Sequence, residues 1–196
     1  QGYGDVGVHG NPHLKTPSMD ALYRDSVRFT DFHVAPLCAP TRASLMSGCD
    51  PFRCRVWDTH QGRHLLRSDY RTIADAFAAN GYQTALFGKW HLGDSYPFRP
   101  EDRGFQEVTR HGGGGVVQAG NHHAAGSFNA TYLDNGKWKR FPGYCNDVWF
   151  DQAIEFIEQN KSEPFFCYLA TNAPHAPHVA PPSDIAPYAN LDIPEY

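Results

Sequence analysis

Five side chains that could bind or attack an anion follow three predicted extended segments. Cys38 and Arg42 lie in PLCAPTRASLMSG, Lys89 and His91 in GKWHLG, and His175 in NAPHAPH. Arg42 comes four residues after Cys38 and so shares a face of the helix predicted there. Lys89 and His91 share a face of extended backbone. Because a helix N-terminus favours a thiolate or an oxyanion, these residues predict a pocket that holds a tetrahedral oxyanion among Arg, Lys and two His side chains.

Each of these residues also has an ordinary structural explanation. A single cysteine is more often a small buried hydrophobe than a nucleophile, by roughly two to one. Arg42 alone would be a solvated helix residue. The imidazoles of HAPH could simply hydrogen-bond the backbone of their loop or form a chance zinc pair. The composition and the spacing therefore predict an anion-binding pocket and leave its reaction open.

Helices and strands alternate along the chain. Helices are predicted over residues 16–29, 39–48, 73–80 and 146–160, a short extended segment over 28–36, strands over 82–87 and 164–171, and a hairpin over 131–141 with Asn135-Gly136 at its turn. This alternation favours an α/β layered fold with a largely parallel sheet, in which sites gather beyond the carboxyl ends of the strands. The loops after residues 36, 87 and 171 would then bring the five side chains together.

The spacing of apolar residues also predicts which faces are buried. In the helix capped by Thr72, the inward residues are expected to be Ile73, Ala76 and Phe77. In the helix 146–160, the apolar stripe consists of Val148, Ala153, Ile154, Phe156 and Ile157. The continuous apolar run PFFCYLAT suits a strand that is buried on both faces.

The bulk properties exclude several classes of protein. The chain has 196 residues and a net charge of −4, with a pI near 6.2, whereas a nucleic-acid binder needs clustered Lys and Arg. No apolar run approaches the ~20 residues that span a bilayer. The five cysteines form no C-x-x-C pair, so buried free thiols are expected rather than a zinc ribbon or a Cys49–Cys54 disulfide. No linker divides the sequence, and one domain, or most of one, is expected over residues 1–196.

Four stretches, in order along the chain, carry a resemblance to one protein family. CAPTRASLMSG resembles the sulfatase signature C-x-P-[ST]-R-x-x-L-x-[ST]-G, and GYQTALFGKWHLG resembles the second signature of that family, G-Y-x-T-x-x-x-G-K-W-H-L-G. NAPHAPH is similar to its sulfate-contacting His loop, and QGYGD is similar to the segment after its first strand. DRGFQEV also fits family members. The likeness runs along most of the chain, and four motifs in order are specific.

The resemblance implies an alkaline-phosphatase-like α/β/α sandwich that hydrolyses sulfate esters of sulfated carbohydrates or aryl sulfates. In this family a formylglycine-generating enzyme oxidises the motif cysteine to formylglycine, and the hydrate of that aldehyde is the nucleophile. Cys38 would be this residue and also a metal ligand. Calcium is the expected ion, because the hydrate together with carboxylate and amide oxygens makes a hard oxygen site.

The resemblance also assigns roles to the other four residues. Arg42 would be read by the maturing enzyme and would stabilise the hydrate. His91 would orient the hydrate and assist the elimination of sulfate. Lys89 would hold a sulfate oxygen and help to protonate the leaving group, and His175 would contact sulfate.

The family pattern further predicts that part of the domain lies outside these residues. The paired Asp ligands of the family would precede Gln1, and a later Asp-Asn pair and a Lys would come after Tyr196. The sandwich is therefore expected to be incomplete at both ends, lacking its first strand and its C-terminal part, and residues 1–196 alone are expected to be inactive. Cys49 stands where the family usually has Arg, which bears on the maturation of Cys38. Export to a periplasmic, extracellular or lysosome-like compartment is expected, with the signal segment outside this sequence.

Two other functions fit the same residues. A phosphonate monoester or phosphodiester hydrolase shares the fold and the C-x-P-x-R nucleophile, and phosphate is as tetrahedral as sulfate, although GKWHLG favours sulfate. A non-catalytic binder of sulfated glycans would keep Cys38 as a thiol. A sugar pocket could be lined by Trp57, His60, His64, Gly112–Gly115 and His122-His123.

Overall fold

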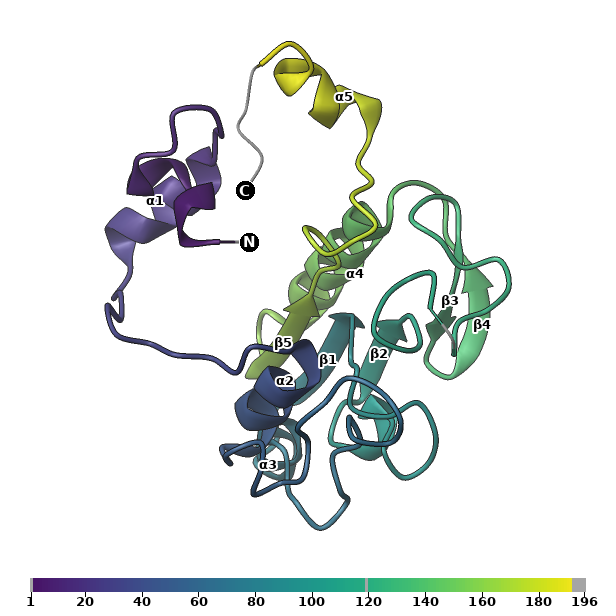
Figure 1. Cartoon of the computed structure of the whole chain (residues 1–196). Helices are drawn as coiled ribbons and strands as arrows, with labels where there is room; N and C mark the ends of the chain where they lie inside the picture. Colours follow the sequence, from purple (N-terminus) through teal and green to yellow (C-terminus); the bar gives the residue numbers. More distant parts are fainter. Residues whose placement is uncertain (1, 119, 192–196) are drawn as a thin grey trace. The chain divides into compact units, whose positions relative to one another are not determined.

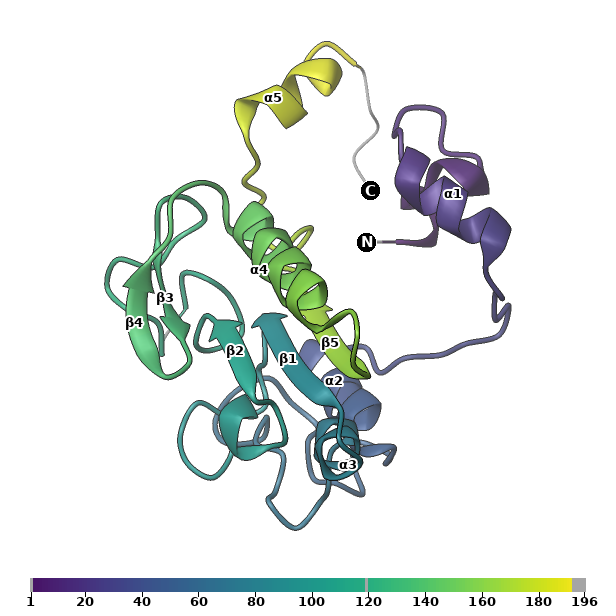
Figure 2. The same ribbon diagram turned by 180° about the vertical axis from the view of Figure 1, so that it is seen from behind.

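The computed structural model describes residues 2–118 and 120–191 (Figures 1 and 2). Its contacts divide the chain into two compact units, one of Gln1–His33 with His178–Tyr196 and one of Val34–Pro177. All five predicted site residues belong to the second unit. Within the described residues, no helix combines the length and the apolar character that a membrane crossing requires.

The second unit is built on a mixed sheet of five strands in the order β4-β3-β2-β1-β5. The strands are β1 (Gln83–Gly88), β2 (Glu107–Arg110), β3 (Thr131–Asp134), β4 (Lys137–Arg140) and β5 (Phe165–Ala170). β1 pairs in parallel with β2 and with β5, and its last residue is in register with the last residue of each neighbour. The hairpin β3–β4 adds antiparallel to β2. The three parallel strands therefore end together, and the residues that come after them meet at one end of the sheet.

Helices cover both faces of this sheet and confirm the α/β/α layering. α4 (Cys145–Asn160) lies along one face, and α2 (Cys38–Ser47) and α3 (Ile73–Ala79) lie on the other (Figures 1 and 2). Successive side chains of a strand point to opposite faces. Leu86 of β1 accordingly packs in the core with α2 and α3, whereas Ala85 and Phe87 pack in the core with α4.

α3 begins where the sequence predicts, but it buries a different face. The Thr72 hydroxyl accepts the N–H of Asp75, and the Asp75 carboxylate accepts the N–H of Thr72, which forms a capping box. The prediction that Ile73 and Ala76 face inward is wrong, because both are exposed and Ala74 is buried. In an alanine-rich helix of two turns, the apolar residues surround the axis, so the spacing does not single out one face.

The buried area on α4 and β5 is also smaller than expected. Val148, Ala153 and Phe156 of α4 are buried, as predicted, whereas Ile154 and Ile157 are exposed. The strand β5 has half-buried side chains rather than two buried faces. It pairs with β1 on one side only among the described residues. A strand with one neighbour is covered less than a strand between two.

The first unit contains the helices α1 (Pro17–Asp25) and α5 (Pro182–Ile185). It also contains the 3-10 helices η1 (Tyr3–Asp5), η2 (Gly7–His9) and η4 (Ala186–Tyr188). The 3-10 helix η3 (Pro100–Asp102) belongs to the second unit. α1 confirms the predicted start and ends at Asp25, inside the predicted range 16–29. Residues 28–36 contain no strand. A strand needs a partner for its backbone groups, and none of the described strands pairs with these residues. The prediction of three strand ends around the site is therefore wrong for this segment.

Candidate active site

Cys38 is the first residue of α2, directly after the extended N-cap residue Leu37. Its Sγ lies 3.2 Å from Nδ1 of His91, although 53 residues separate the two in sequence. The helix is held in place by the residues that come after Cys38, since Ala39 and Ala43 are fully buried against the sheet. The thiol is therefore fixed at the end of the sheet where the parallel strands finish.

Arg42 connects α2 to β5 and to the residue that follows β1. Its Nη1 donates to the carbonyl oxygen of Lys89 (2.8 Å) and to the hydroxyl of Tyr168 on β5 (3.1 Å). Lys89 follows β1 directly and is only 3% exposed. Burial lowers the pKa of Lys89, the nearby Cys38 thiol opposes that change, and the Arg42 charge adds to it. The structure thus brings a helix start, a guanidinium and a buried ammonium group to one place.

His91 faces Cys38 with an acceptor nitrogen. Its Nε2 lies 2.9 Å from the carbonyl oxygen of Thr59. A carbonyl only accepts, so in the neutral ring Nε2 carries the hydrogen and Nδ1 offers its lone pair to the thiol. The imidazole is 6% exposed. Burial, followed by the neighbouring Lys89 charge, lowers the pKa of His91 to about 4. His91 is therefore a neutral acceptor beside residue 38.

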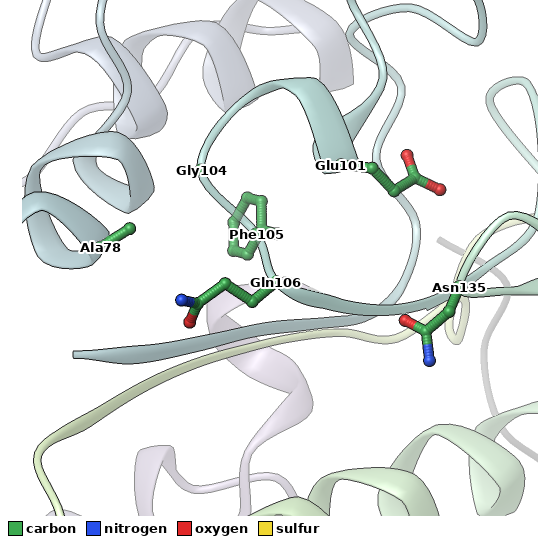
Figure 3. A pocket seen from close by; sticks show the side chains of 6 residues that line it. All are labelled: Ala78, Glu101, Gly104, Phe105, Gln106 and Asn135. Atoms are coloured by element: carbon green, nitrogen blue, oxygen red, sulfur yellow. The ribbon is translucent and has the colours of Figure 1, made fainter. Parts of the chain in front are cut away.

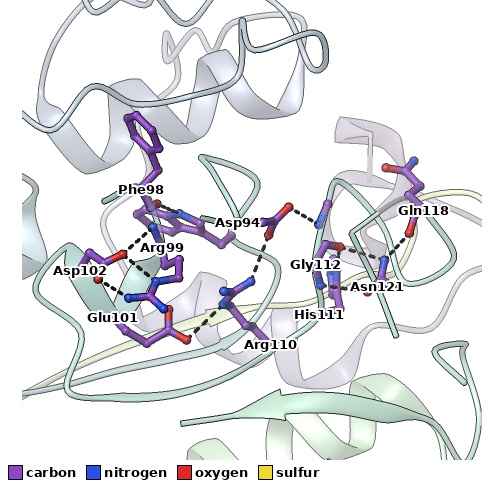
Figure 4. Close-up of polar contacts among 12 residues, drawn as sticks. Asp94, Phe98, Arg99, Glu101, Asp102, Arg110, His111, Gly112, Gln118 and Asn121 are labelled. Atoms are coloured by element: carbon purple, nitrogen blue, oxygen red, sulfur yellow. Dashed lines mark hydrogen bonds and ion pairs between the residues drawn. The ribbon is translucent and has the colours of Figure 1, made fainter. Parts of the chain in front are cut away.

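A polar network fixes the glycine-rich turn that comes after β2 (Figure 4). Arg110 is 1% exposed and donates to Asp94 (Nη1 to Oδ1, 3.0 Å) and to Glu101 (Nε to Oε1, 3.4 Å). Asp94 Oδ2 in turn accepts a backbone N–H of the run Gly112–Gly115 at 2.8 Å. The Asn121 carboxamide bonds backbone groups at both ends of that run. The turn is held firmly although it consists of glycine.

This turn forms a wall against the imidazole of His91. A Cβ atom added to Gly114 would lie 2.5 Å from Cε1 of His91. Real Cβ contacts are not that short, so only glycine allows the backbone to approach the ring this closely. The ring of His64 lies beside the same imidazole, tilted by 39°, with its centroid 5.6 Å away. Burial and the proximity of His91 lower the pKa of His64.

His175 does not join the cluster in the described structure. Its side chain is exposed, and its Nδ1 donates to the neighbouring carbonyl oxygen of Ala176 at 2.7 Å. Its backbone N–H is bonded to the carbonyl oxygen of Asn172 at 2.9 Å. The structure therefore gathers Cys38, Arg42, Lys89 and His91 and leaves the imidazole of His175 outside.

Some residues of the site were not identified from the sequence. Tyr168 lies two positions after Phe166 in an alternating strand, so its partnership with α2 could have been inferred from the period of β5. The glycine run was visible in the sequence as a candidate sugar pocket, but not as the wall behind His91. The Thr59 carbonyl leaves no signal in the sequence, because any residue supplies one.

The residues around Cys38 do not by themselves fit a calcium ion. Calcium takes six to eight oxygen ligands, mostly carboxylates and carbonyls. The cluster instead holds a guanidinium, an ammonium and an imidazole, and among the described residues no three His, Cys, Asp or Glu side chains are grouped as a metal site. That the remaining ligands come from other parts of the protein stays a prediction. The five cysteines are free, as expected.

A pocket elsewhere in the second unit is lined by Ala78, Glu101, Gly104, Phe105, Gln106 and Asn135 (Figure 3). It lies beside the residues that lead into β2, whereas Lys89 and His111 come after the opposite ends of the strands. None of the predicted site residues lines it. It therefore has no part in the cluster around Cys38.

Comparison with known proteins places the chain in a family. Residues 1–194 match the family model described as "Sulfatase", and the chain belongs to the sulfatase family. It is 29% identical over 195 residues to an arylsulfatase of Klebsiella aerogenes, covering 92% of this chain and 42% of that protein. It is 30% identical over 200 residues to the N-acetylgalactosamine-6-sulfatase of Homo sapiens, covering 90% of this chain and 38% of that protein.

Solved structures agree with this assignment. The crystal structure of Ps i-CgsB matches with a TM-score of 0.86 and 31% identity, covering 98% of this chain and 47% of that one. The structure of BT4656 with D-glucosamine-2-N,6-O-disulfate matches with a TM-score of 0.79 and 26% identity, covering 98% and 36%. The predicted alkaline-phosphatase-like fold is confirmed by these neighbours. The chain spans less than half the length of each of these relatives.

Proposed function

We propose that the protein to which this chain belongs hydrolyses sulfate esters, with sulfated carbohydrates as the substrate class. Family membership supports the reaction. The names of the relatives support the substrate class, since they include an N-acetylgalactosamine-6-sulfatase and structures with k-i-k-neocarrahexaose and with D-glucosamine-2-N,6-O-disulfate. The single observation that carries the proposal is the contact of 3.2 Å between Cys38 Sγ and His91 Nδ1, beside a buried Lys89.

Formylglycine at position 38 is part of this proposal. A formylglycine-generating enzyme is the expected maturation partner, and the aldehyde hydrate supplies the oxygen that attacks sulfur. His91 suits the role of proton acceptor for that group, because its Nε2–H is bound to Thr59 and its Nδ1 faces residue 38. Arg42 would act on the same residue, and it already holds the backbone of Lys89.

Lys89 and His175 are proposed to hold sulfate. The Lys89 ammonium is desolvated, and in a site of low dielectric a cation binds an anionic oxygen more strongly than in water. A lowered pKa also makes its proton easier to donate to the departing alkoxide. The exposed imidazole of His175 would bind sulfate from the loop after β5, and its Nδ1 is bonded to the Ala176 carbonyl.

Several wider statements belong to the same proposal. Residues 1–196 would be part of one catalytic domain whose other part completes the calcium site, so that this stretch alone neither binds calcium tightly nor turns over sulfate esters. The whole protein would be exported to a periplasmic, extracellular or lysosome-like compartment. Arylsulfatase activity from residues 1–196 alone would contradict the first of these statements.

Peptide mass spectrometry of residue 38 tests the proposal. The full-length protein is co-expressed with a formylglycine-generating enzyme, and the expected result is an aldehyde at position 38. The matched control is Arg42→Lys, which should reduce conversion because Arg42 belongs to the motif that the maturing enzyme reads. A thiol at position 38 under these conditions, combined with tight binding of sulfated glycans, would instead support the non-catalytic binder. Conversion with faster cleavage of phosphate esters would support the phosphodiester hydrolase.

A further inference from the structure

His111 is a buried histidine that the proposed mechanism does not use. It comes directly after β2 and is 1% exposed. Its Nδ1 lies 2.8 Å from the carbonyl oxygen of Gly112, and its Nε2 lies 2.9 Å from Nδ2 of Asn172. Asn172 belongs to the loop after β5, 61 residues further along the chain. The ring therefore bridges the ends of two strands that flank β1.

The indole of Trp149 determines which atoms of this bridge carry the hydrogens. Trp149 of α4 is fully buried, and its Nε1–H, which can only donate, lies 2.8 Å from Oδ1 of Asn172. The amide of Asn172 must then turn its NH2 group towards His111. The His111 Nε2 accordingly accepts, and its Nδ1–H donates to the Gly112 carbonyl. The indole of Trp149, the amide of Asn172 and both ring nitrogens of His111 all have partners in only one arrangement of hydrogen atoms. In that arrangement the His111 ring is neutral.

Asn172, which the bridge contacts, is also bonded to the backbone of His175. The carbonyl oxygen of Asn172 accepts the N–H of His175 at 2.9 Å, and the N–H of Asn172 donates to Oδ1 of Asn146 at 3.0 Å. Asn172 is thus held by α4 through two side chains and by β2 through His111. Removing the His111 acceptor would leave the NH2 group of the half-buried Asn172 without this partner, which would loosen the hold on its amide.

The other side of the bridge leads to His91. His111 Nδ1 bonds the first residue of the run Gly112–Gly115, whose Gly114 packs against the His91 ring. The loop with His175 and the wall behind His91 therefore share one support. His111 reaches these two segments through the Gly112 carbonyl and the Asn172 side chain and contacts neither the His91 nor the His175 imidazole in these bonds, so it would act on the position of those rings and not on their chemistry.

We propose that His111 is a positioning residue of the sulfatase site, which holds the Asn172 amide and thereby places the His175 loop to receive the sulfate group. This inference rests on the proposed function. It predicts that the acceptor at His111 Nε2 governs the affinity for sulfate rather than the chemical step. The neutral charge of the ring is consistent with its surroundings, because burial and the charges of Lys89, Arg42 and Arg110 all disfavour a proton on it.

Three variants of the full-length, matured protein test the inference. His111→Leu removes the acceptor, and His111→Gln keeps one, because the Gln oxygen can reach towards Asn172 in place of Nε2. Tyr132→Phe is the matched control: Tyr132 is 1% exposed and packs against the same Trp149, and the hydroxyl that this variant removes bonds the Gly126 carbonyl at 2.6 Å rather than Asn172.

The first readout is kinetic. For His111→Leu, the KM for 4-nitrophenyl sulfate and the inhibition constant of inorganic sulfate are both expected to rise about tenfold, with a smaller change in kcat. His111→Gln should recover most of this affinity, and Tyr132→Phe should leave both constants unchanged. Equal losses of thermal stability in His111→Leu and Tyr132→Phe, with unchanged sulfate affinity in both, would show that His111 is merely structural and would overturn the inference.

The second readout does not need turnover. Amide hydrogen exchange of residues 171–177 is expected to accelerate in His111→Leu and to stay at the wild-type rate in His111→Gln and Tyr132→Phe. If the matured wild type cleaves no sulfate ester, the proposed function fails, and this exchange experiment still decides whether His111 holds the loop. Unchanged exchange in His111→Leu would contradict the inference whatever the activity.

Discussion

The imidazole of His91 shows how a few ordinary groups can set up a reactive position. The Thr59 carbonyl fixes the hydrogen on one nitrogen, and the other nitrogen is thereby left as an acceptor 3.2 Å from the side chain of residue 38. Burial keeps the ring neutral. The reactive position at residue 38 therefore depends on a backbone atom, the Thr59 carbonyl oxygen, as much as on the side chains of the motifs.

The first prediction concerns Gly114, where there is no room for a side chain. In Gly114→Ala, the new Cβ would lie 2.5 Å from His91 Cε1 and 2.7 Å from Gln118 Oε1. Gln118 can move, but the His91 ring is held by two contacts. We expect kcat for a sulfate ester to fall about tenfold and the free energy of unfolding to fall by about 1–3 kcal/mol. The control is Gly126→Ala, since its Cβ would meet no atom within 4 Å. Equal kcat values for both variants would contradict this account of the wall.

The buried His111 gives a prediction about pH. Burial lowers its pKa in the folded protein to about 3, whereas the unfolded value is about 6.5. The unfolded chain therefore binds the proton first as the pH falls. Stability from this group is fully present above pH 6.5 and is lost progressively towards pH 3, by about 2 kcal/mol at pH 5.

The measurement compares urea unfolding of the wild type and His111→Gln at pH 7 and pH 5, because glutamine has no such titration. The wild type should lose more stability between these two values than the variant does. Equal losses in the two proteins would show that His111 does not take up a proton on unfolding in this range.

At the scale of elements, the parts of the fold that depend on neighbouring residues could be predicted. The hairpin β3–β4 turns at Asn135-Gly136 because both residues adopt positive φ angles, of 47° and 78°, which this dipeptide favours. The capping box of Thr72 and Asp75 and the start of α2 arise from equally local rules. The buried face of α3 and the edge of the buried face of α4, where Ile154 and Ile157 are exposed, could not be predicted, because they depend on how far the sheet extends.

In the candidate site, too, contacts within one segment could be predicted from the sequence and contacts between distant segments could not. Short spacing identified Cys38 with Arg42 and Lys89 with His91, since each pair lies within one element or turn. The contacts with Thr59, Tyr168 and Gly114 join distant segments, and no pattern within any one of them reveals its partner. The extended segment expected over 28–36 does not pair as a strand of the sheet for a related reason, because the local sequence alone does not supply a neighbouring strand.

The N-terminus of α3 gives a prediction for an element. Thr72 is 2% exposed, accepts the Asp75 N–H at 3.0 Å and lies 2.8 Å from the Arg103 carbonyl. Thr72→Ala should lower the free energy of unfolding by about 1–2 kcal/mol, measured by urea denaturation. Thr72→Ser keeps the hydroxyl and should lose clearly less. If the two variants were equally destabilised, the methyl group rather than the cap would be responsible.

At the scale of the whole molecule, the parallel pairing of β1 with β2 and β5 explains why the candidate site lies where it does. The three strands end in register, so Lys89, His111 and Thr171 come after them at one end of the sheet. α2 reaches the same end with Cys38 at its first residue. The fold thereby gathers Cys38, a neutral acceptor and two cationic side chains in one place, and positioned cations of this kind are suited to stabilising the negative charge of a sulfate ester.

The most direct test of this account is the specificity of the full-length, matured protein. We expect kcat/KM for 4-nitrophenyl sulfate to exceed that for a matched phosphonate monoester, 4-nitrophenyl phenylphosphonate, and we expect the sulfatase activity to disappear in Cys38→Ala. Sulfate release from the Cys38→Ala variant at the wild-type rate, or a clear preference of the wild type for the phosphonate, would contradict it.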